Sequence, residues 1–143
     1  MAGLVFVDTN LLVYAHNSAD ARKQAIAAAA VEHAWLTGTG IVSTQVLQEF
    51  YVTATRKWIP PLVRDDARQL VAAYSQWRLV QVDTPMILAA SELEEAHTIS
   101  FWDALIVEAA RRGGATVLLS EDLQHGRQFG DLEVRNPFVE PSA

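Results

Sequence analysis

The sequence of 143 residues contains no cysteine. This absence excludes a disulfide framework, a thiolate metal site and a thiol nucleophile, and it fits a reducing compartment. No apolar run approaches the roughly 18 residues that a membrane-spanning helix needs. The first apolar run also has no basic segment before it. We therefore expect no signal peptide, no membrane contact and a cytoplasmic location.

Positive charge is scarce as well: 11 Lys and Arg stand against 17 Asp and Glu, a formal net charge of −6. Proteins that bind the phosphates of nucleic acids usually present a basic face, so the overall charge argues mildly against such a partner. Net charge is an average, however, and an acidic protein still binds nucleic acid where its acids collect metal ions. The positions of the acids are therefore more informative than their number.

Apolar residues are abundant: they make up 50% of the chain, enough for a substantial core. The length is typical of one domain, so we expect a single domain over residues 1–143. Turn signals at 37–40, Pro60-Pro61 and Gly113-Gly114 divide the chain into short apolar runs and longer helical patterns. This organisation predicts alternating strands and helices.

The apolar runs predict buried strands, and the longer patterns predict helices. The predicted strands are 4–7, 41–43, 79–82, 116–119 and a short last one around Val134; the predicted helices begin near Asn10 and Ser100, open at Thr84-Pro85, and span about 19–36, 44–58 and 64–77. Such alternation implies right-handed crossovers and a sheet covered on both faces. The sequence therefore predicts a three-layer α/β/α sandwich with a central, mostly parallel sheet.

Four acids fall at the ends of predicted strands or in the helices that follow them. They are Asp8 after the first strand, Glu49 in the helix after the second, Asp103 in the first turn of the helix opened by Ser100, and Asp122 after 116–119. In open parallel sheets, ligands bind beyond the carboxyl ends of the strands. All four side chains are therefore expected to reach one rim of the sheet.

Each acid also has a purely structural interpretation. Asp8 is a good N-cap for the following helix, and Asp122 suits the cap of a turn. Ser100 and Asp103 resemble a capping box with Asp in place of Glu or Gln. Glu49 lies among apolar residues and would then form a salt bridge or face outward. Taken singly, none of the four identifies a site.

The conjunction of the four acids is more specific. Carboxylates gathered at one rim repel one another and raise each other's pKa unless a cation lies among them. Oxygen ligands without His or Cys suit Mg²⁺ or Mn²⁺ better than Zn²⁺. One or two such ions would activate water and stabilise the charge that develops on phosphate. The pattern therefore favours hydrolysis of a phosphodiester.

Four sequence segments carry these acids in order: FVDTNLLVYA, VSTQVLQEFY, SFWDALIVEAA and LLSEDLQHG. They resemble the motifs of PIN domains, in particular of the VapC toxins of bacterial toxin–antitoxin pairs, and the closing LEVRNPF resembles the end of these chains. The resemblance covers nearly the whole sequence. It implies a metal-dependent endoribonuclease whose catalytic, metal-holding residues are Asp8, Glu49, Asp103 and Asp122. It also implies an RNA substrate, a VapB-like antitoxin partner and a homodimer.

Two neighbours of Asp8 belong to the same motif. The resemblance implies that Thr9 helps to order the site, and Asn10 either shares this role or holds the turn by side-chain hydrogen bonds. Two features leave the fourth motif open. Gly126 stands where some family members carry another acid or Asn, so the second ion would be held weakly or arrive with substrate. Glu121 adjoins Asp122, and position in the motif favours Asp122 as the fourth acid.

Basic and aromatic residues near the motifs are weaker candidates. His125 and Arg127 would contact a substrate phosphate, or would simply belong to a solvated loop. Arg56-Lys57 ends a predicted helix, where cations favour the helix dipole. Trp102 beside Asp103 would pack in the core or at the rim of the site. The resemblance to VapC toxins makes 56–74 a candidate for an antitoxin groove or a dimer contact.

Two other classes of function compete with the nuclease hypothesis. A phosphorylation-dependent receiver domain also gathers acids at strand ends, but it needs a Lys at a later strand end, and the only lysines are Lys23 and Lys57 in helical segments. The second alternative is a non-catalytic metal-binding or protein-interaction module of the same fold. Metal titration beside an activity assay separates this module from an enzyme.

Overall fold

The computed structural model describes residues 3–139 of the chain; the remaining residues of the expected domain, 1–2 and 140–143, lie outside the described part. The strands are β1 (Leu4–Val7), β2 (Gly40–Ser43), β3 (Arg78–Val80), β4 (Ala115–Leu119), β5 (Gln128–Phe129) and β6 (Leu132–Arg135). The helices are α1 (Thr9–His16), α2 (Ala21–Thr37), α3 (Thr44–Val52), the π-helical turn η1 (Thr53–Lys57), α4 (Arg64–Tyr74), α5 (Thr84–His97) and α6 (Phe101–Gly113).

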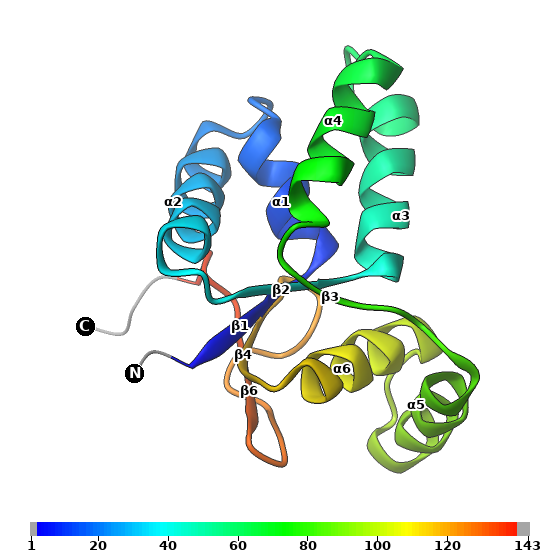
Figure 1. Ribbon diagram of the computed structural model, residues 1–143. Coiled ribbons are helices and arrows are strands. Elements are labelled where there is room, and N and C mark those ends of the chain that lie inside the picture. Colours follow the sequence, from blue (N-terminus) through cyan, green and yellow to red (C-terminus); the bar gives the residue numbers. More distant parts are fainter. Residues whose placement is uncertain (1–2, 140–143) are drawn as a thin grey trace.

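The strands form one six-stranded sheet in the order β3-β2-β1-β4-β6-β5. All neighbours pair in parallel except β5 and β6, which form an antiparallel hairpin at one edge. Helices α1 to α4 lie on one side of the sheet, and α5 and α6 lie on the other (Figure 1). The predicted three-layer α/β/α sandwich with a mostly parallel sheet is therefore confirmed.

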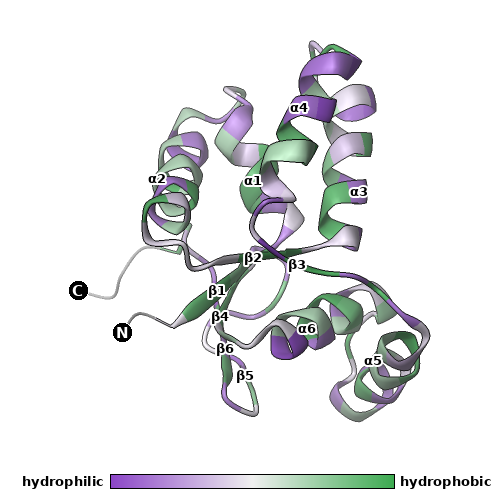
Figure 2. Ribbon diagram, viewed as in Figure 1, coloured by the Kyte–Doolittle hydropathy of each residue, from purple (hydrophilic) through white to green (hydrophobic). Residues whose placement is uncertain are grey.

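The core lies on both faces of the two central strands. Phe6 and Val7 of β1 and Leu118 of β4 are fully buried, as are Ile41 and Val42 of β2. Figure 2 shows β1 largely in the hydrophobic colour, whereas the helices mix hydrophobic and hydrophilic stretches. Strands covered on both faces need such continuous apolar runs, which explains why they were visible in the sequence.

Short polar residues cap three helices that begin near the carboxyl ends of the strands. Asp8 caps α1, accepting a hydrogen bond from the Thr9 amide, and Ser43 caps α3 through the Val46 amide. Ser100 caps α6 through the amide of Asp103. Each cap satisfies an amide that the first helical turn leaves without a partner. The caps therefore fix the starts of three helices at the same rim of the sheet.

The structure differs from the sequence prediction in several places. The predicted helix 44–58 is α-helical only to Val52 and continues as η1. The helix predicted over 64–77 ends at Tyr74, and the strand predicted over 79–82 is shifted to Arg78–Val80. The hairpin strand β5 was not predicted, because two residues carry too little periodicity. None of the helices within residues 3–139 has the length and apolar character that spanning a bilayer requires.

Candidate active site

A cavity of about 410 Å³ opens at the carboxyl ends of the central strands. Its walls include all four predicted acids, Asp8, Glu49, Asp103 and Asp122, together with Thr9 and Asn10. The other lining residues are Gln45, Gln48, Val52, Thr53, Lys57, Trp102 and Ile106. The structure thus brings together six predicted residues from four separate segments of the chain.

Asp8 lines this cavity and is itself only 5% exposed. The register pairs Val7 with Leu119, so the residues that follow, Asp8 and Ser120, are neighbours just beyond the ends of the adjacent strands β1 and β4. Oδ1 of Asp8 accepts a 2.7 Å hydrogen bond from the Thr9 amide, and Oδ2 accepts a 2.9 Å bond from the Ser120 hydroxyl. Asp8 is therefore both an N-cap and part of the cavity wall.

The environment of Asp8 disfavours its charged form. The pKa of Asp8 is raised from 3.8 to about 7: burial is the largest cause and the charges of Asp122 and Glu49 contribute, against the lowering effect of the bonds from Thr9 and Ser120. Burial removes water that stabilises a carboxylate, and nearby carboxylates repel it. A cation in the cavity would reverse this penalty, so the site favours positive charge.

Glu49 reaches the cavity from the second turn of α3. Its Oε1 accepts a 2.8 Å hydrogen bond from the hydroxyl of Thr9, which links α3 to α1. Among the ion pairs within the described residues, none involves Glu49. The structural interpretation of Glu49 as a salt-bridge partner is therefore not supported. The second oxygen of its carboxylate remains available for other partners.

Asp103 and Asp122 complete the acidic wall. The backbone amide of Asp103 donates to Ser100 Oγ at 3.0 Å, so the expected cap bond forms and leaves the carboxylate itself available. Asp122 Oδ2 accepts a 3.1 Å bond from the Asn10 amide group. Burial raises the pKa of Asp122, and the charges of Asp103 and Glu121 add to the rise, while the Asn10 bond lowers it. The charge of Asp103 therefore contributes to the environment of Asp122.

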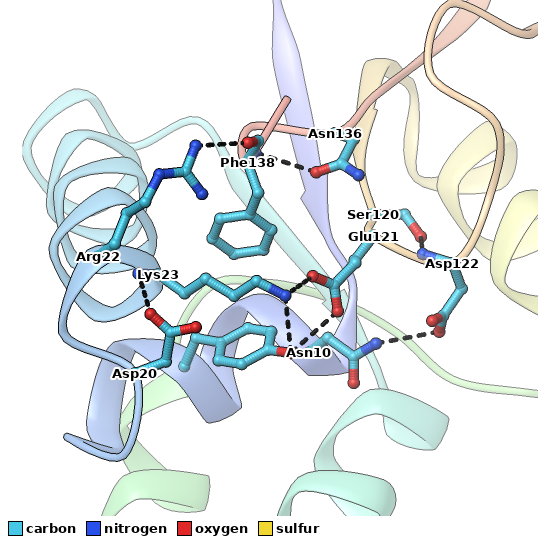
Figure 3. A network of polar contacts seen from close by, with 10 residues as sticks. Asn10, Asp20, Arg22, Lys23, Ser120, Glu121, Asp122, Asn136 and Phe138 are labelled. Carbon is cyan, nitrogen blue, oxygen red and sulfur yellow. Dashed lines mark hydrogen bonds and ion pairs between the residues drawn. The ribbon is translucent and has the colours of Figure 1, made fainter. Parts of the chain in front are cut away.

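Glu121 is not among the residues that line the cavity, and Figure 3 shows its side chain directed toward Lys23. Its carboxylate pairs with the ammonium group of Lys23 on α2 and accepts a 2.9 Å bond from the Tyr14 hydroxyl. The Lys23 ammonium also lies 4.8 Å from the centre of the Tyr14 ring and 5.2 Å from that of Phe138. These contacts hold the loop after β4 so that Asp122, and not Glu121, lines the cavity.

The donor set of the cavity fits a hydrated Mg²⁺ or Mn²⁺ ion. Its walls offer carboxylate oxygens and the amide of Gln45, whose buried Oε1 has no hydrogen-bond donor among the described residues. Within residues 3–139, no three acidic or histidine side chains converge into a ready-made metal cluster. Mg²⁺ is usually held by only one or two carboxylates, with waters and substrate phosphates as its other ligands, so the wall meets this lower requirement.

His125 and Arg127 are not among the residues that line the cavity. Nδ1 of His125 accepts a 3.0 Å bond from the Asn136 amide. The Arg127 guanidinium donates to the carbonyl of His97 at 2.8 Å and lies 4.9 Å from the centre of the Phe129 ring. Both side chains are therefore engaged in holding the hairpin loop beside the last strands.

The sequence prediction missed several residues of the site. Ser120 was not singled out, although a polar residue at the end of the buried run TVLLS is a signal for it. Gln45 lies one turn before Glu49 and shares its helix face, which helical spacing makes predictable, and Gln48 directly precedes Glu49. Trp102 is 63% exposed, so it belongs to the rim and not to the core. Lys57 was interpreted as a dipole-stabilising charge and as part of the candidate contact region 56–74, not as a residue of this cavity.

Comparison with known proteins agrees with this architecture. The model of the PIN domain family matches residues 5–128 of the chain. The fold and the site define the class: an α/β domain with an acidic cavity at the carboxyl ends of its strands. The chain belongs to the PIN domain family. No curated protein matches the sequence significantly.

Two solved structures share the fold. One is VapC20 of Mycobacterium tuberculosis, described as a sarcin–ricin loop cleaving toxin, with a TM-score of 0.61, 24% identity, and coverage of 82% of this chain and 91% of that one. The other is a toxin–antitoxin complex from Klebsiella pneumoniae, with a TM-score of 0.67, 16% identity, and coverage of 94% and 98%. At this level of identity the similarity concerns the fold.

Proposed function

We propose that the protein is a metal-dependent endoribonuclease that hydrolyses RNA phosphodiester bonds. The observation that carries the proposal is the convergence of Asp8, Glu49, Asp103 and Asp122 on one cavity. Four carboxylates from four chain segments are costly to gather, as the raised pKa of Asp8 illustrates. A site that tolerates this repulsion is best explained by a bound cation.

In this proposal the four acids hold one or two Mg²⁺ or Mn²⁺ ions. When bound, such an ion supplies Lewis acidity toward phosphate and a more acidic water. The side chains of Thr9, Asn10 and Ser120 keep the carboxylates in position through the hydrogen bonds described above. Hydrogen-bonded outer groups of this kind commonly orient metal-binding carboxylates.

A residue at the rim of the cavity favours a nucleic acid as the substrate rather than a small phosphate ester. Trp102 exposes 63% of its surface beside Asp103 and packs on Phe101, with ring centres 5.3 Å apart. An exposed indole next to a phosphate-binding site provides a stacking surface for an unpaired base. We therefore propose single-stranded or looped RNA as the substrate, read partly by shape.

The toxin role rests on the names of the two structural neighbours, one a toxin and the other a toxin–antitoxin complex. We propose that this protein is likewise the toxin of a type II pair, with a VapB-like antitoxin as partner, and that it forms a homodimer. Co-expression with the product of the adjacent reading frame, followed by size-exclusion chromatography with light scattering, tests both assemblies. A monomer that ignores that product would contradict this part of the proposal.

RNA cleavage in vitro tests the nuclease. The wild-type protein is expected to cut RNA with Mg²⁺ or Mn²⁺, and both EDTA and Asp8→Asn are expected to abolish cleavage. Asp20→Asn is the matched control, because Asp20 also caps a helix but is exposed and does not line the cavity. Cleavage that survives EDTA and Asp8→Asn contradicts the metal mechanism. Calorimetric saturation by metal without any cleavage would instead indicate the non-catalytic module.

Induced expression in bacteria tests the toxin role separately. We expect growth arrest by the wild-type protein and normal growth with Asp103→Asn. Asp83→Asn serves as the control, since Asp83 caps α5 and does not line the cavity. Harmless expression of a protein that cleaves RNA in vitro would retain the nuclease and exclude the toxin.

A further inference from the structure

Lys57 is the one basic residue among those that line the cavity. It faces a wall that otherwise contributes four carboxylates, in a protein whose net charge is −6. An acidic wall repels the phosphates of an approaching RNA wherever metal does not neutralise it. A lysine at this position supplies the opposite charge on the protein itself.

The π-helical turn η1 determines that this residue is Lys57. The amide of Trp58 donates to the carbonyl of Thr53 at 3.1 Å, five residues earlier, instead of to the residue four earlier. In a continuous α-helix Arg56, seven residues after Glu49, would share its face, and Lys57 would lie about 100° further around. The π-helical turn contains one more residue than an α-helical turn, so Lys57 takes the place on the face of Glu49 that Arg56 would otherwise have. Glu49, Thr53 and Lys57 consequently line the cavity, whereas Arg56 does not.

The end of η1 is anchored in the core. Trp58 is 7% exposed and packs edge-on against Phe50, with ring centres 6.1 Å apart. Ala54 is fully buried, and its carbonyl accepts a 2.9 Å bond from the Leu62 amide. The position of Lys57 therefore follows from a fixed local geometry. Single π-helical turns within α-helices occur frequently at functional sites.

The ammonium group of Lys57 is also uncommitted. The ion pairs of the described residues join Lys23 to Glu121, Arg112 to Glu108 and Arg135 to Glu133. Lys57 takes part in none of them and is exposed. Lys23, by contrast, is occupied in the network behind the cavity. A free ammonium group on a helical wall is suited to a phosphate ligand, which lysine contacts as a point charge.

We propose that Lys57, placed by the π-helical turn η1, is a substrate-binding residue that contacts an RNA phosphate beside the acidic wall. This inference rests on the proposed nuclease function and adds a residue that the acidic motifs do not include. Lys57 would lower the cost of bringing a phosphate to the carboxylates. Its contribution belongs to substrate binding, so it should alter KM more than kcat.

Equilibrium binding of a labelled single-stranded RNA tests the proposal. Fluorescence anisotropy is measured against KCl concentration in an Asp103→Asn background, which suppresses cleavage. Lys57→Gln should weaken affinity about tenfold or more at low salt. It should also reduce the salt slope by about 0.7, the value for one lost phosphate contact on a single strand. Lys57→Arg should restore both, and Arg56→Gln, which removes the same charge from the adjacent residue, should change neither.

Cleavage kinetics with the otherwise wild-type protein separate this proposal from the nuclease proposal. A raised KM with little change in kcat for Lys57→Gln, but not for Arg56→Gln, supports Lys57 as the phosphate contact. Equal effects of the two variants would indicate general attraction and would overturn it, as would no effect of Lys57→Gln on binding. RNA binding that depends on Lys57 without any metal-dependent cleavage would overturn the nuclease function and leave the Lys57 contact standing.

Discussion

The hydroxyl of Thr9 donates a 2.8 Å hydrogen bond to Oε1 of Glu49, across 40 residues of sequence. This bond joins the first turn of α1 to the second turn of α3, and Thr9 itself is only 8% exposed. Its backbone amide at the same time binds Asp8. One residue therefore fixes the relative positions of two carboxylates of the cavity, and its removal should disturb both metal binding and cleavage.

Thr9→Val tests this linkage, because valine keeps the shape of threonine and loses only the hydroxyl. We expect Mn²⁺ affinity and RNA cleavage to fall by about 10- to 100-fold, the usual cost of losing a group that orients a metal ligand. Isothermal titration with Mn²⁺ and a cleavage assay measure the two effects. Thr9→Ser retains the hydroxyl and is expected to stay near wild type; a loss as large as that of Thr9→Val would refute the role of the bond.

The pH dependence of stability tests the environment of Asp8. Its pKa in the folded protein is about 7, above the ordinary 3.8, so the folded state retains a proton that the unfolded chain releases. The contribution of Asp8 to the free energy of unfolding is therefore largest below about pH 4 and is lost as pH rises to about 7. Asp8→Asn removes this dependence while keeping a good N-cap residue.

We accordingly expect Asp8→Asn to be more stable than the wild-type protein at pH 8 in EDTA, by more than about 1 kcal/mol. The advantage should shrink toward pH 4 and should also shrink when Mg²⁺ is added at pH 8. Urea unfolding at several pH values measures it, with Asp20→Asn as control. An Asp8→Asn protein that is less stable than wild type at every pH would contradict the burial argument.

Separate substitutions of the two adjacent acids after β4 test which of them serves the site. Asp122→Asn should reduce cleavage by more than about 100-fold, beyond the usual effect of groups that merely orient ligands. Glu121→Gln should keep most activity and lower the free energy of unfolding only slightly, because its ion pair with Lys23 is partly exposed to solvent. The reverse ranking of the two variants in a cleavage assay would assign the role to Glu121.

Removal of the exposed indole at the rim tests base stacking. Trp102→Ala should weaken binding of single-stranded RNA by about 1–3 kcal/mol, the range for one stacked base. Trp102→Phe should retain most of the affinity. Leu36→Ala removes another apolar side chain, 79% exposed and outside the cavity, and should change nothing. Anisotropy titrations in an Asp103→Asn background measure all three; equal affinities would exclude stacking on Trp102.

The sequence predicted those features of the fold and the site that depend on residues close together in the chain. The buried strands around Phe6 and Leu118 were visible as apolar runs, and the parallel direction of the strands followed from their alternation with helices. The capping and the site interpretations of Asp8 and Asp103 are compatible. The hydrogen bonds at Asp8 and Ser100 form helix caps, while the carboxylates of Asp8 and Asp103 line the cavity. Strand ends thus predicted where the acids would meet.

Features set by distant packing were not predictable in this way. The choice between Glu121 and Asp122 depends on Lys23, which is 98 residues from Glu121 in the chain. The π-helical turn follows from the burial of Trp58 against Phe50, and no local rule distinguishes Lys57 from Arg56. These details arise only when helices from separate parts of the chain pack together.

The hydrogen bond between Ser120 and Asp8 joins residues that are 112 positions apart. It exists only when β4 has been inserted beside β1, a pairing whose loop must close across most of the chain. A nascent chain that has not yet emerged as far as β4 lacks both Asp122 and the partner of Asp8. The cavity is therefore incomplete until the part of the chain that carries β4, Ser120 and Asp122 has been synthesised and has paired with β1.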